Sequence, residues 1–382
     1  MIYLDNAAST PISNSIMDSV ATIVKEYGNP SSIHKKGRAA KNMIEEARKN
    51  ILNYIHAEEG TVIFTSGGTE SNNLAVLGMA AYMKKNNKKT IITTKIEHPS
   101  VLNACKYLEN EFGFKVFYMP VCYDGRVDIE ELYRIMCENK DTLGLVTIQA
   151  VNSEIGTIQL INDIGALCEE FNVPFHTDAV QAIGHIGINV KKDNISFLSI
   201  SGHKIFAPKG IGALYVKDIS ILSPVILGGG QENGLRSGTE NTLGIACLGM
   251  AIKQCEDFAL YRMEMVKKLR KIFLDTLQSY MKVPYKINYW NGVENIISLT
   301  IRKVEGNSLM LMLNNKNVCV STGSACSSNK LGSSHVLRAI GIEDTDAICT
   351  IRISLSSLNT EEEVNTAAKI ISETAKQLRD LV

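Results

Sequence analysis

Residues 61–81, TVIFTSGGTESNNLAVLGMAA, join a short β-rich run to a helical run through Ser66-Gly67-Gly68-Thr69. Because the Gly-Gly turn opens the helix, backbone N–H groups and the positive end of the helix dipole face any anion placed there. A Gly-Gly turn at the start of a helix is more often purely structural. The stretch alone therefore predicts a strand-turn-helix unit with a candidate phosphate site.

Further β-rich runs follow this unit and alternate with helical stretches. Together the runs are TVIFTS, TIITT, KVFYMPV, LGLVTIQAV, VPFHTDAV, ISFLSIS and GALYVKD, all between residues 61 and 218. Such alternation predicts an α/β fold with a mostly parallel sheet covered by helices. In these sheets ligands bind at the carboxyl ends of the strands, so we expect the site residues directly after the runs.

The pattern changes after about residue 255. A long charged helix is followed by a strand near NIISLTI, a helix near SLMLMLNN and strands at NVCVST and CTIRISL. Thr360 and Glu363 form a capping box that begins the last helix. We therefore expect a large domain at 15–254, and a small α+β domain made of 1–14 with 255–382.

Composition narrows the class of protein. Lys plus Arg and Asp plus Glu each number 40, and this zero formal net charge argues against a broad nucleic-acid or anionic-membrane surface. An apolar run of the roughly 20 residues that span a bilayer is absent, so we expect a soluble, cytoplasmic protein. The nine cysteines contain no C-x-x-C pair, which predicts neither a disulfide framework nor a metal site.

Asp178 and Lys204 each follow a predicted strand. Alone, Asp178 would be read as a helix cap and Lys204 as a surface charge. Together with a phosphate cup they match the needs of pyridoxal phosphate, a lysine amine for a Schiff base and a carboxylate that keeps the pyridine nitrogen protonated. A second Gly-rich stretch, GGGQENGLRSGTEN, adds further candidate phosphate ligands in Arg236, Ser237 and Thr239.

Three other side chains are candidates for chemistry. His98 follows the strand TIITTKIE at the same sheet edge, where stacking and proton transfer suit it, although a lone histidine is more often a cap. Cys326 lies among small polar residues in STGSACSS, a setting for an exposed thiol that accepts and carries sulfur. Arg352 on the strand CTIRISL is either a carboxylate clamp or half of a structural ion pair.

With these residues in view, the whole chain resembles the cysteine desulfurases of the NifS/IscS type, which are class V aminotransferases. The matching motifs are YLDNAAST, FTSGGTESNNL, Glu97-His98, HTDAVQ, SGHKIFAPKGIGALYV, RSGTEN and STGSACSS followed by HVLRAIG. The resemblance implies the pyridoxal-phosphate transferase fold of type I, with a seven-stranded sheet. It also implies a homodimer that converts L-cysteine to alanine and leaves a persulfide on Cys326 for an acceptor protein.

The resemblance assigns roles to individual residues. Lys204 would hold pyridoxal phosphate as a Schiff base, with Asp178 on the pyridine nitrogen, Gln181 on the ring oxygen and His98 stacked on the ring. The implied phosphate ligands are Gly68, Thr69, Ser201, His203 and, from the partner subunit, Thr239. Arg352 would hold the substrate carboxylate.

One position departs from the family pattern. Two adjacent asparagines usually precede Glu-x-Gly, but VNSEIG has Asn152 and then Ser153. The amide expected beside the cofactor and the substrate carboxylate is therefore a shorter hydroxyl. We expect both residues near the substrate, and neighbouring side chains in an extended segment point apart, so Asn152 replaces that amide only if the loop rearranges.

Other functions compete with this reading. A selenocysteine lyase or a small amino-acid aminotransferase would use the same cofactor, and an aminotransferase would not need Cys326. A catalytically weak docking partner for a sulfur carrier is the alternative from another class. The family supplies sulfur to iron–sulfur cluster assembly, transfer-RNA thiolation and DNA sulfur modification, and the residues do not choose among these.

Overall fold

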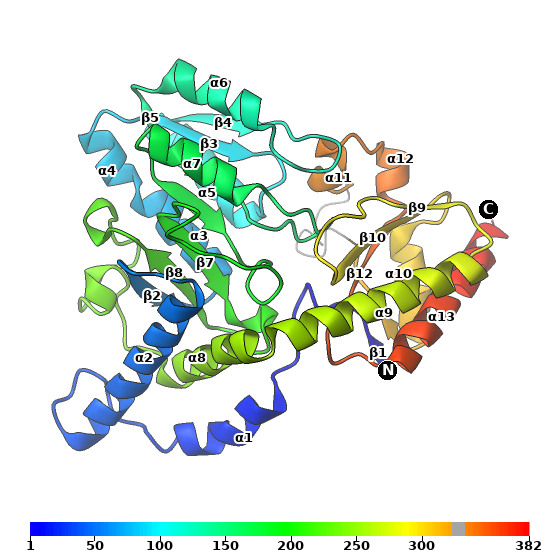
Figure 1. The fold of residues 1–382 in the computed structure, drawn as a ribbon, viewed down its shortest axis with the longest axis horizontal. Coiled ribbons are helices and arrows are strands. Elements are labelled where there is room, and N and C mark those ends of the chain that lie inside the picture. The colour runs from blue at the N-terminus through cyan, green and yellow to red at the C-terminus, as the bar shows by residue number, and fades with distance from the viewer. Residues whose placement is uncertain (323–332, 382) are drawn as a thin grey trace.

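The computed structural model describes residues 1–322 and 333–381. Figure 1 shows a larger lobe around a central sheet and a smaller lobe beside it, with α8 (Thr242–Asp257) and α9 (Ala259–Tyr280) running end to end beneath them. Helix α8 packs in a core of the larger lobe and α9 in the core of the smaller one, so this helix pair links the two. Among the described helices, none has both the length and the hydrophobicity that crossing a bilayer requires.

The predicted sheet is present, with all seven strands. In spatial order they are β2 (Thr61–Thr65), β8 (Gly212–Val216), β7 (Phe197–Ser201), β6 (Phe175–Asp178), β5 (Leu143–Thr147), β3 (Thr90–Thr94) and β4 (Lys115–Met119). Strand β8 runs antiparallel to both of its neighbours and the remaining pairs are parallel, which confirms the mostly parallel sheet. The central strands are buried throughout, as expected for a sheet covered on both faces.

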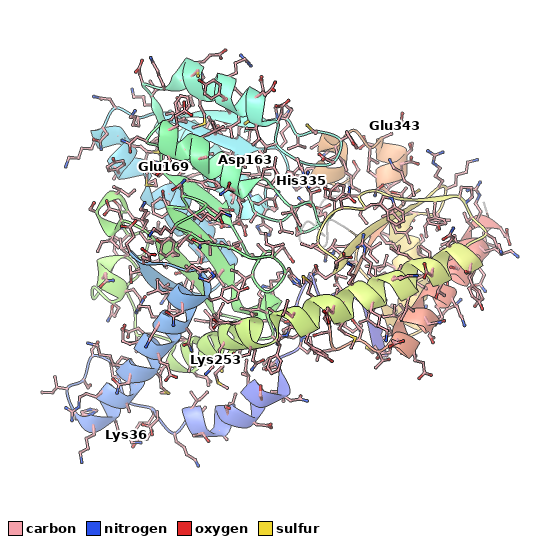
Figure 2. All side chains as sticks on the ribbon, in the orientation of Figure 1. Lys36, Asp163, Glu169, Lys253, His335 and Glu343 are labelled. Atoms are coloured by element: carbon pink, nitrogen blue, oxygen red, sulfur yellow. The ribbon has the colours of Figure 1, made fainter. Side chains whose placement is uncertain are left out.

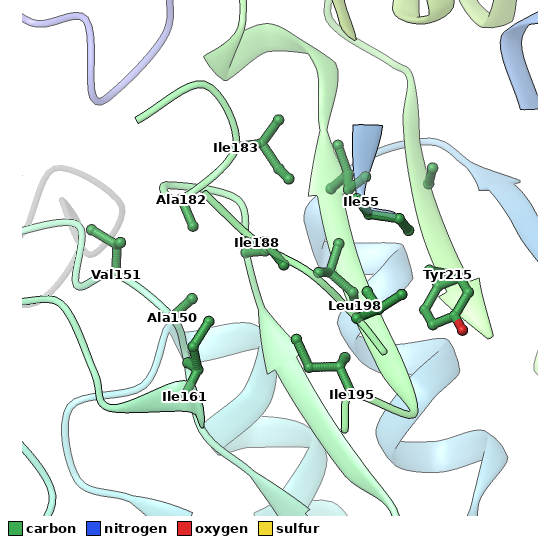
Figure 3. Close-up of a cluster of buried hydrophobic side chains, with 14 of the residues drawn as sticks. Ile55, Ala150, Val151, Ile161, Ala182, Ile183, Ile188, Ile195, Leu198 and Tyr215 are labelled. Atoms are coloured by element: carbon green, nitrogen blue, oxygen red, sulfur yellow. The ribbon is translucent and has the colours of Figure 1, made fainter. Parts of the chain in front are cut away.

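Helices cover both faces of this sheet. Besides α8 they are α1 (Asn14–Ile23), α2 (Lys35–Tyr54), α3 (Gly68–Gly78), α4 (Ala80–Lys85), α5 (Pro99–Phe112), α6 (Ile129–Asn139) and α7 (Ile161–Glu170). Alternate strand residues enter different cores, because successive side chains of a strand point to opposite faces. Leu198 and Tyr215 lie in one core with Ile55 and Ile195 (Figure 3), whereas Phe197 lies in the other.

The smaller lobe has a three-stranded antiparallel sheet in the order β12 (Thr350–Ser354), β10 (Ile296–Ile301) and β9 (Tyr285–Ile287). Helices α9, α10 (Gly306–Asn315) and α13 (Glu361–Arg379) supply its core. The capping box of Thr360 and Glu363 is present at the start of α13. The strand expected at NVCVST is only β11 (Val318–Cys319), and it lies outside this sheet.

The N-terminal segment belongs to the smaller lobe before it enters the larger one. Strand β1 (Ile2–Tyr3) pairs in parallel with β11, and Leu4 is buried in the small-lobe core. The next residues lie along Ser354 of β12, whose Oγ accepts a hydrogen bond from the Ala7 N–H at 2.9 Å. Residues 1–8 are therefore held in place by two strands from the other end of the chain.

One part of the C-terminal segment packs away from the small-lobe core. Helices α11 (His335–Ala339) and α12 (Asp344–Ala347) follow the undescribed residues 323–332. Val336 and Leu337 form a separate buried cluster with Ile96 and Ile155 of the larger lobe. His335, labelled in Figure 2, thus lies where α11 meets the larger lobe.

Candidate active site

A cavity of about 630 Å³ lies at the carboxyl ends of the parallel strands. Residues that follow β3, β5, β6 and β7 line it, together with the first turn of α3, Arg352 of β12 and His335 of α11. A second hollow of about 470 Å³ adjoins it at that first turn of α3. The two share five lining residues, Ala8, Gly68, Thr69, Ser201 and His203.

The turn from β2 into α3 forms the floor of the smaller hollow. Gly67 has φ of 154° and ψ of −178°, a conformation that is open essentially only to glycine. A Cβ added to Gly68 would lie 2.7 Å from Cγ2 of Val180, so a larger residue would collide there. The first N–H groups of a helix have no partner within the helix. Gly68 and Thr69 therefore present donors to an anion, as the sequence predicted.

His203 is the basic side chain expected at this hollow. Its ring lies 3.4 Å from Ser9 Oγ, and burial followed by the nearby Lys204 and Lys209 lowers the pKa of His203 to about 4. The imidazole is therefore neutral at pH 7 and can hydrogen-bond to a phosphate. Ser201 at the end of β7 is buried and lines both hollows.

The second Gly-rich stretch contributes less than expected within one chain. Arg236 Nε donates to Glu70 Oε1 at 2.9 Å, and Ser237 Oγ accepts from the Gly230 N–H at 3.2 Å. Thr239 is exposed and lines neither hollow. In this chain Ser237 therefore stabilises the Gly-rich loop itself, and Arg236 ties that loop to the first turn of α3.

Asp178 ends β6 and lines the larger cavity. Its Oδ1 accepts from the Val180 N–H at 3.0 Å and its Oδ2 accepts from Asn72 Nδ2 at 2.7 Å. Asn72 Nδ2 also donates to Ser100 Oγ at 2.9 Å, and Ser100 Oγ lies 2.7 Å from His98 Nδ1. A continuous polar network thus joins the carboxylate to the histidine. Sequence reasoning missed Asn72 and Ser100, although Asn72 stands one helical turn after Gly68 on the buried side of α3.

His98 is both a helix cap and a residue of the cavity wall. It is the N-cap of α5, since the Ser100 N–H donates to His98 Nδ1 at 3.2 Å, and it lines the cavity. Because Nδ1 is occupied by Ser100, Nε2 is the ring nitrogen left for a proton from a ligand.

Lys204 lies at the end of the 3-10 turn η1 (Gly202–Lys204) that follows β7. Its Nζ donates to the carbonyls of Ala7 at 2.6 Å and Ala8 at 2.8 Å. Gln181 Nε2 donates to the same Ala7 carbonyl at 2.9 Å. The N-terminal segment is therefore part of the site, which spacing along the sequence could not reveal.

Arg352 is both a cavity residue and half of an ion pair. Its Nη2 donates to Asp5 Oδ1 at 2.9 Å and its Nη1 donates to the Ser153 carbonyl at 2.9 Å. Its Nε is buried and has no partner among the described residues. Arg352 therefore reaches the cavity already oriented, with one donor unsatisfied.

Ser153 and Asn152 are placed differently. Ser153 lines the cavity, whereas Asn152 does not. Asn152 Oδ1 accepts from the N–H groups of Glu154 at 2.8 Å and Ile155 at 3.0 Å, and its Nδ2 donates to the Ile96 carbonyl at 3.1 Å. The Asn152 side chain thus holds the turn and is not available to replace the missing amide.

Two buried glutamates at the cavity were not predicted as site residues. Burial raises the pKa of Glu154 to about 7, and Ser334 Oγ donates to its Oε2. Burial raises the pKa of Glu97 to about 8, although Thr94 Oγ1 donates to Glu97 Oε1 at 2.7 Å and the Gln149 N–H donates to Oε2 at 3.0 Å. Both carboxyl groups titrate near neutral pH, so the cavity wall changes charge there.

Glu97 should make stability depend on pH. Its folded pKa of about 8 lies above the ordinary value of 4.5, so the folded state retains a proton that the unfolded state loses. This contribution is fully present below pH 4.5 and is lost as pH rises through about 8. We expect the free energy of unfolding of the wild type, relative to Glu97→Gln, to fall by a few kcal/mol from about pH 5 to 9. Urea unfolding of both proteins measures it, with exposed Glu361→Gln as the control; a pH-independent difference would refute the assignment.

Cys326 lies outside the described residues. On one side of that gap Ser321 forms a β-bridge with Arg352, a residue of the cavity wall. On the other side His335 lines the cavity, and its Nε2 lies 3.0 Å from the Glu97 carbonyl oxygen. The eight described cysteines are unpaired thiols, and none of them lines the larger cavity. Across the described chain, no group of three or more His, Cys, Asp or Glu side chains is arranged to hold a metal ion.

Comparison with known proteins gives concordant matches. The family model "Aminotransferase class-V" matches residues 2–366. The cysteine desulfurase IscS of Dictyoglomus turgidum is 42% identical over 390 residues, covering 100% of this chain and 96% of that protein. The mitochondrial cysteine desulfurase of Arabidopsis thaliana is 42% identical over 385 residues, covering 100% of this chain and 83% of that protein.

Solved structures match as well. A NifS-like protein superposes with a TM-score of 0.90 and 35% identity, covering 99% of this chain and 100% of the other. SspA, solved in complex with cysteine, superposes with a TM-score of 0.82 and 36% identity, covering 94% of this chain and 100% of SspA.

Proposed function

Since this chain belongs to the class V aminotransferase family and is a pyridoxal-phosphate-dependent cysteine desulfurase, we propose that its two adjoining hollows hold the cofactor and L-cysteine. The observation that carries this proposal is the meeting of Lys204, Asp178 and the first turn of α3 around one cavity. These residues come from separate parts of the chain. A surface lysine or a simple helix cap would not converge in this way.

The residues present fit the cofactor. Gly68 and Thr69 offer backbone N–H donors in a space that a Cβ would fill, which suits the phosphate. The Asp178 carboxylate accepts one hydrogen bond on each oxygen, which leaves lone pairs for a protonated ring nitrogen. Lys204 would bind the cofactor covalently, with Gln181, Ser201 and His203 as further contacts and Thr239 supplied by the partner subunit.

When bound, pyridoxal phosphate withdraws electrons from the α-carbon of the amino acid. The Asp178 carboxylate would keep the ring nitrogen protonated, and the network through Asn72 and Ser100 fixes both that carboxylate and His98. Lys204 Nζ would take the α proton. His98 would contact the bound cofactor and carry a proton on Nε2.

Cys326 provides the sulfur acceptor. Its thiolate forms an S–S bond to the substrate sulfur as the carbon–sulfur bond breaks, and the electron pair of that bond stays with the carbon skeleton. The skeleton gains one proton at Cβ, regains the α proton from Lys204 at Cα, and leaves as L-alanine. The flanking residues Ser321 and His335 support this role, because each contacts a residue of the cavity wall.

Arg352 would hold the substrate carboxylate, with Ser153 beside it. We expect Arg352→Lys to raise KM for L-cysteine about tenfold to hundredfold, since lysine cannot form a bidentate pair, and to lower kcat much less. Steady-state kinetics measure this, with the exposed small-lobe Arg302→Lys as control. A loss confined to kcat would contradict carboxylate binding by Arg352.

We also propose that the protein is a homodimer, because Thr239 lines neither hollow in one chain and would reach the site of the partner subunit. The persulfide sulfur would pass to an acceptor protein, with iron–sulfur cluster assembly among the uses.

We propose that the protein works in the cytoplasm. Eight unpaired described thiols are consistent with a reducing compartment.

The test is release of L-alanine and sulfide from L-cysteine by purified holoenzyme with a reductant. We expect equal amounts of the two products. A keto acid consumed in place of sulfide release would identify an aminotransferase, and cofactor-loaded protein that yields neither product would overturn the assignment of L-cysteine.

A further inference from the structure

Asp5 contacts the guanidinium of Arg352 from outside the larger cavity. Its Oδ1 accepts from Arg352 Nη2 at 2.9 Å, and the side chains of Asp5 and Arg352 are 20% and 5% exposed. Arg352 lines the larger cavity, whereas Asp5 lines neither that cavity nor the adjoining hollow. Asp5 is therefore placed to act on a bound substrate through Arg352 rather than by touching it.

The backbones of both residues are fixed. Arg352 lies on β12, where it pairs with Ser298 of β10 on one side and forms a bridge with Ser321 on the other. Asp5 forms a parallel bridge with Ser354, two residues further along the same strand. Pairing along β12 therefore brings the Asp5 carboxylate beside the guanidinium of Arg352.

The guanidinium has a second anchor in the larger lobe. Arg352 Nη1 donates to the carbonyl of Ser153, a residue of the cavity wall, at 2.9 Å. Arginine has five N–H groups, and the buried Nε–H of Arg352 has no partner among the described residues. The bonds to Asp5 and Ser153 use one hydrogen on each Nη nitrogen and leave one on each. The two that remain are the number that a bidentate carboxylate needs.

Asp5 also supplies the counter-charge of Arg352. A buried guanidinium without a counter-charge is strongly destabilised, and an unrestrained arginine loses rotamer entropy when it binds a carboxylate. The other carboxyl group near Arg352 is that of Glu154, whose pKa burial raises to about 7, so it carries only part of a negative charge at neutral pH. Asp5 therefore neutralises and orients the guanidinium before a substrate arrives.

We propose that Asp5 is a positioning residue for substrate binding, which holds the Arg352 guanidinium in the orientation that binds the carboxylate of the amino acid. This role rests on the function proposed above, in which Arg352 binds that carboxylate. The same N-terminal segment carries the Ala7 and Ala8 carbonyls that accept from Lys204 Nζ. One segment thus sets the position of the carboxylate-binding group relative to the catalytic lysine.

Binding of two amines to cofactor-loaded protein tests this role, with the absorbance of the cofactor as the signal. L-Alanine has a carboxylate and no sulfur to transfer, and ethylamine is the same molecule without the carboxylate. We expect Asp5→Asn to raise the Kd of L-alanine about tenfold, because the amide keeps the shape of Asp5 but not the charge that fixes Arg352. Binding of ethylamine should stay unchanged, since ethylamine has no group for Arg352 to hold. The control is Asp141→Asn, an exposed position that should affect neither amine.

A double replacement tests whether Asp5 acts through Arg352. In an Arg352→Gln background, Asp5→Asn should weaken binding of L-alanine no further, because the guanidinium that Asp5 positions is absent. If Asp5→Asn does not fold, Asp5→Glu takes its place. It keeps the charge but moves it by one methylene, and should likewise weaken L-alanine and spare ethylamine.

Three results would overturn the role of Asp5. Equal weakening of both amines would mean that Asp5 only maintains the N-terminal segment, and unchanged binding of L-alanine would mean that Arg352 needs no positioning. Tighter binding of L-alanine would mean that Asp5 competes with the substrate for Arg352. Wild-type protein that binds L-alanine no better than ethylamine would instead refute carboxylate binding by Arg352, so failure of the proposed function is recognised separately.

Discussion

Replacement of Lys204 by alanine is expected to lower alanine release from L-cysteine by about 10³-fold or more, because one amine both attaches the cofactor and takes the α proton. The change also removes the two hydrogen bonds to the Ala7 and Ala8 carbonyls. The cofactor can still bind through the phosphate turn and Asp178, so it should become removable by dialysis. Absorbance before and after dialysis, together with alanine release, measures both effects.

The matched control is Lys217→Ala, whose exposed side chain pairs with Glu59 at the start of the large-lobe sheet. It should retain attached cofactor and activity. Added methylamine should partly restore the proton transfer of Lys204→Ala. Activity of Lys204→Ala within tenfold of the wild type would mean that another group takes the α proton.

Replacement of Cys326 by alanine is expected to abolish sulfur transfer while the cofactor stays attached. The other candidate thiols do not substitute, because the eight described cysteines lie outside the larger cavity. Burial also raises the pKa of Cys255 to about 11, so that thiol is protonated at neutral pH and is a poor nucleophile. Incubation with ³⁵S-labelled L-cysteine and separation of the protein without reductant should show label on the wild type and none on Cys326→Ala.

Cys122→Ala removes an exposed cysteine away from the cavity and should keep the label. A labelled Cys326→Ala protein that passes sulfur to an acceptor at the wild-type rate would refute the role of Cys326. The two replacements block different steps of the reaction. Lys204→Ala blocks removal of the α proton, before sulfur is transferred, and Cys326→Ala blocks the sulfur transfer itself.

The sequence was sufficient to predict the parts of the fold that depend on local pattern. All seven strands of the large sheet stand where β-rich runs predicted them, because the runs are rich in the β-branched and aromatic residues that buried strands favour. Lys204 and Asp178 line one cavity because β6 ends at Asp178 and β7 ends one short turn before Lys204, and the ends of parallel strands share one edge of the sheet.

Contacts between distant segments were not predictable in this way. The carbonyls of Ala7 and Ala8 meet Lys204 only because β1 pairs with β11, a two-residue strand with little pattern of its own. The packing of α11 against Ile96 and Ile155 escaped prediction for a similar reason, since a short apolar helix gives no sign of which lobe it joins.

The pairing of the N-terminal segment with late strands also determines when the active site can form during synthesis of the chain. Residues 1–8 leave the ribosome long before their partners Val318 and Ser354. At about 5–20 residues per second, translation separates the two by tens of seconds. During that interval the large sheet can form and place Lys204 beside the end of β7. The Ala7 and Ala8 carbonyls have no fixed position until their own partners are made. Assembly of this centre therefore waits until β11 and β12 have been made, although its lysine is made much earlier.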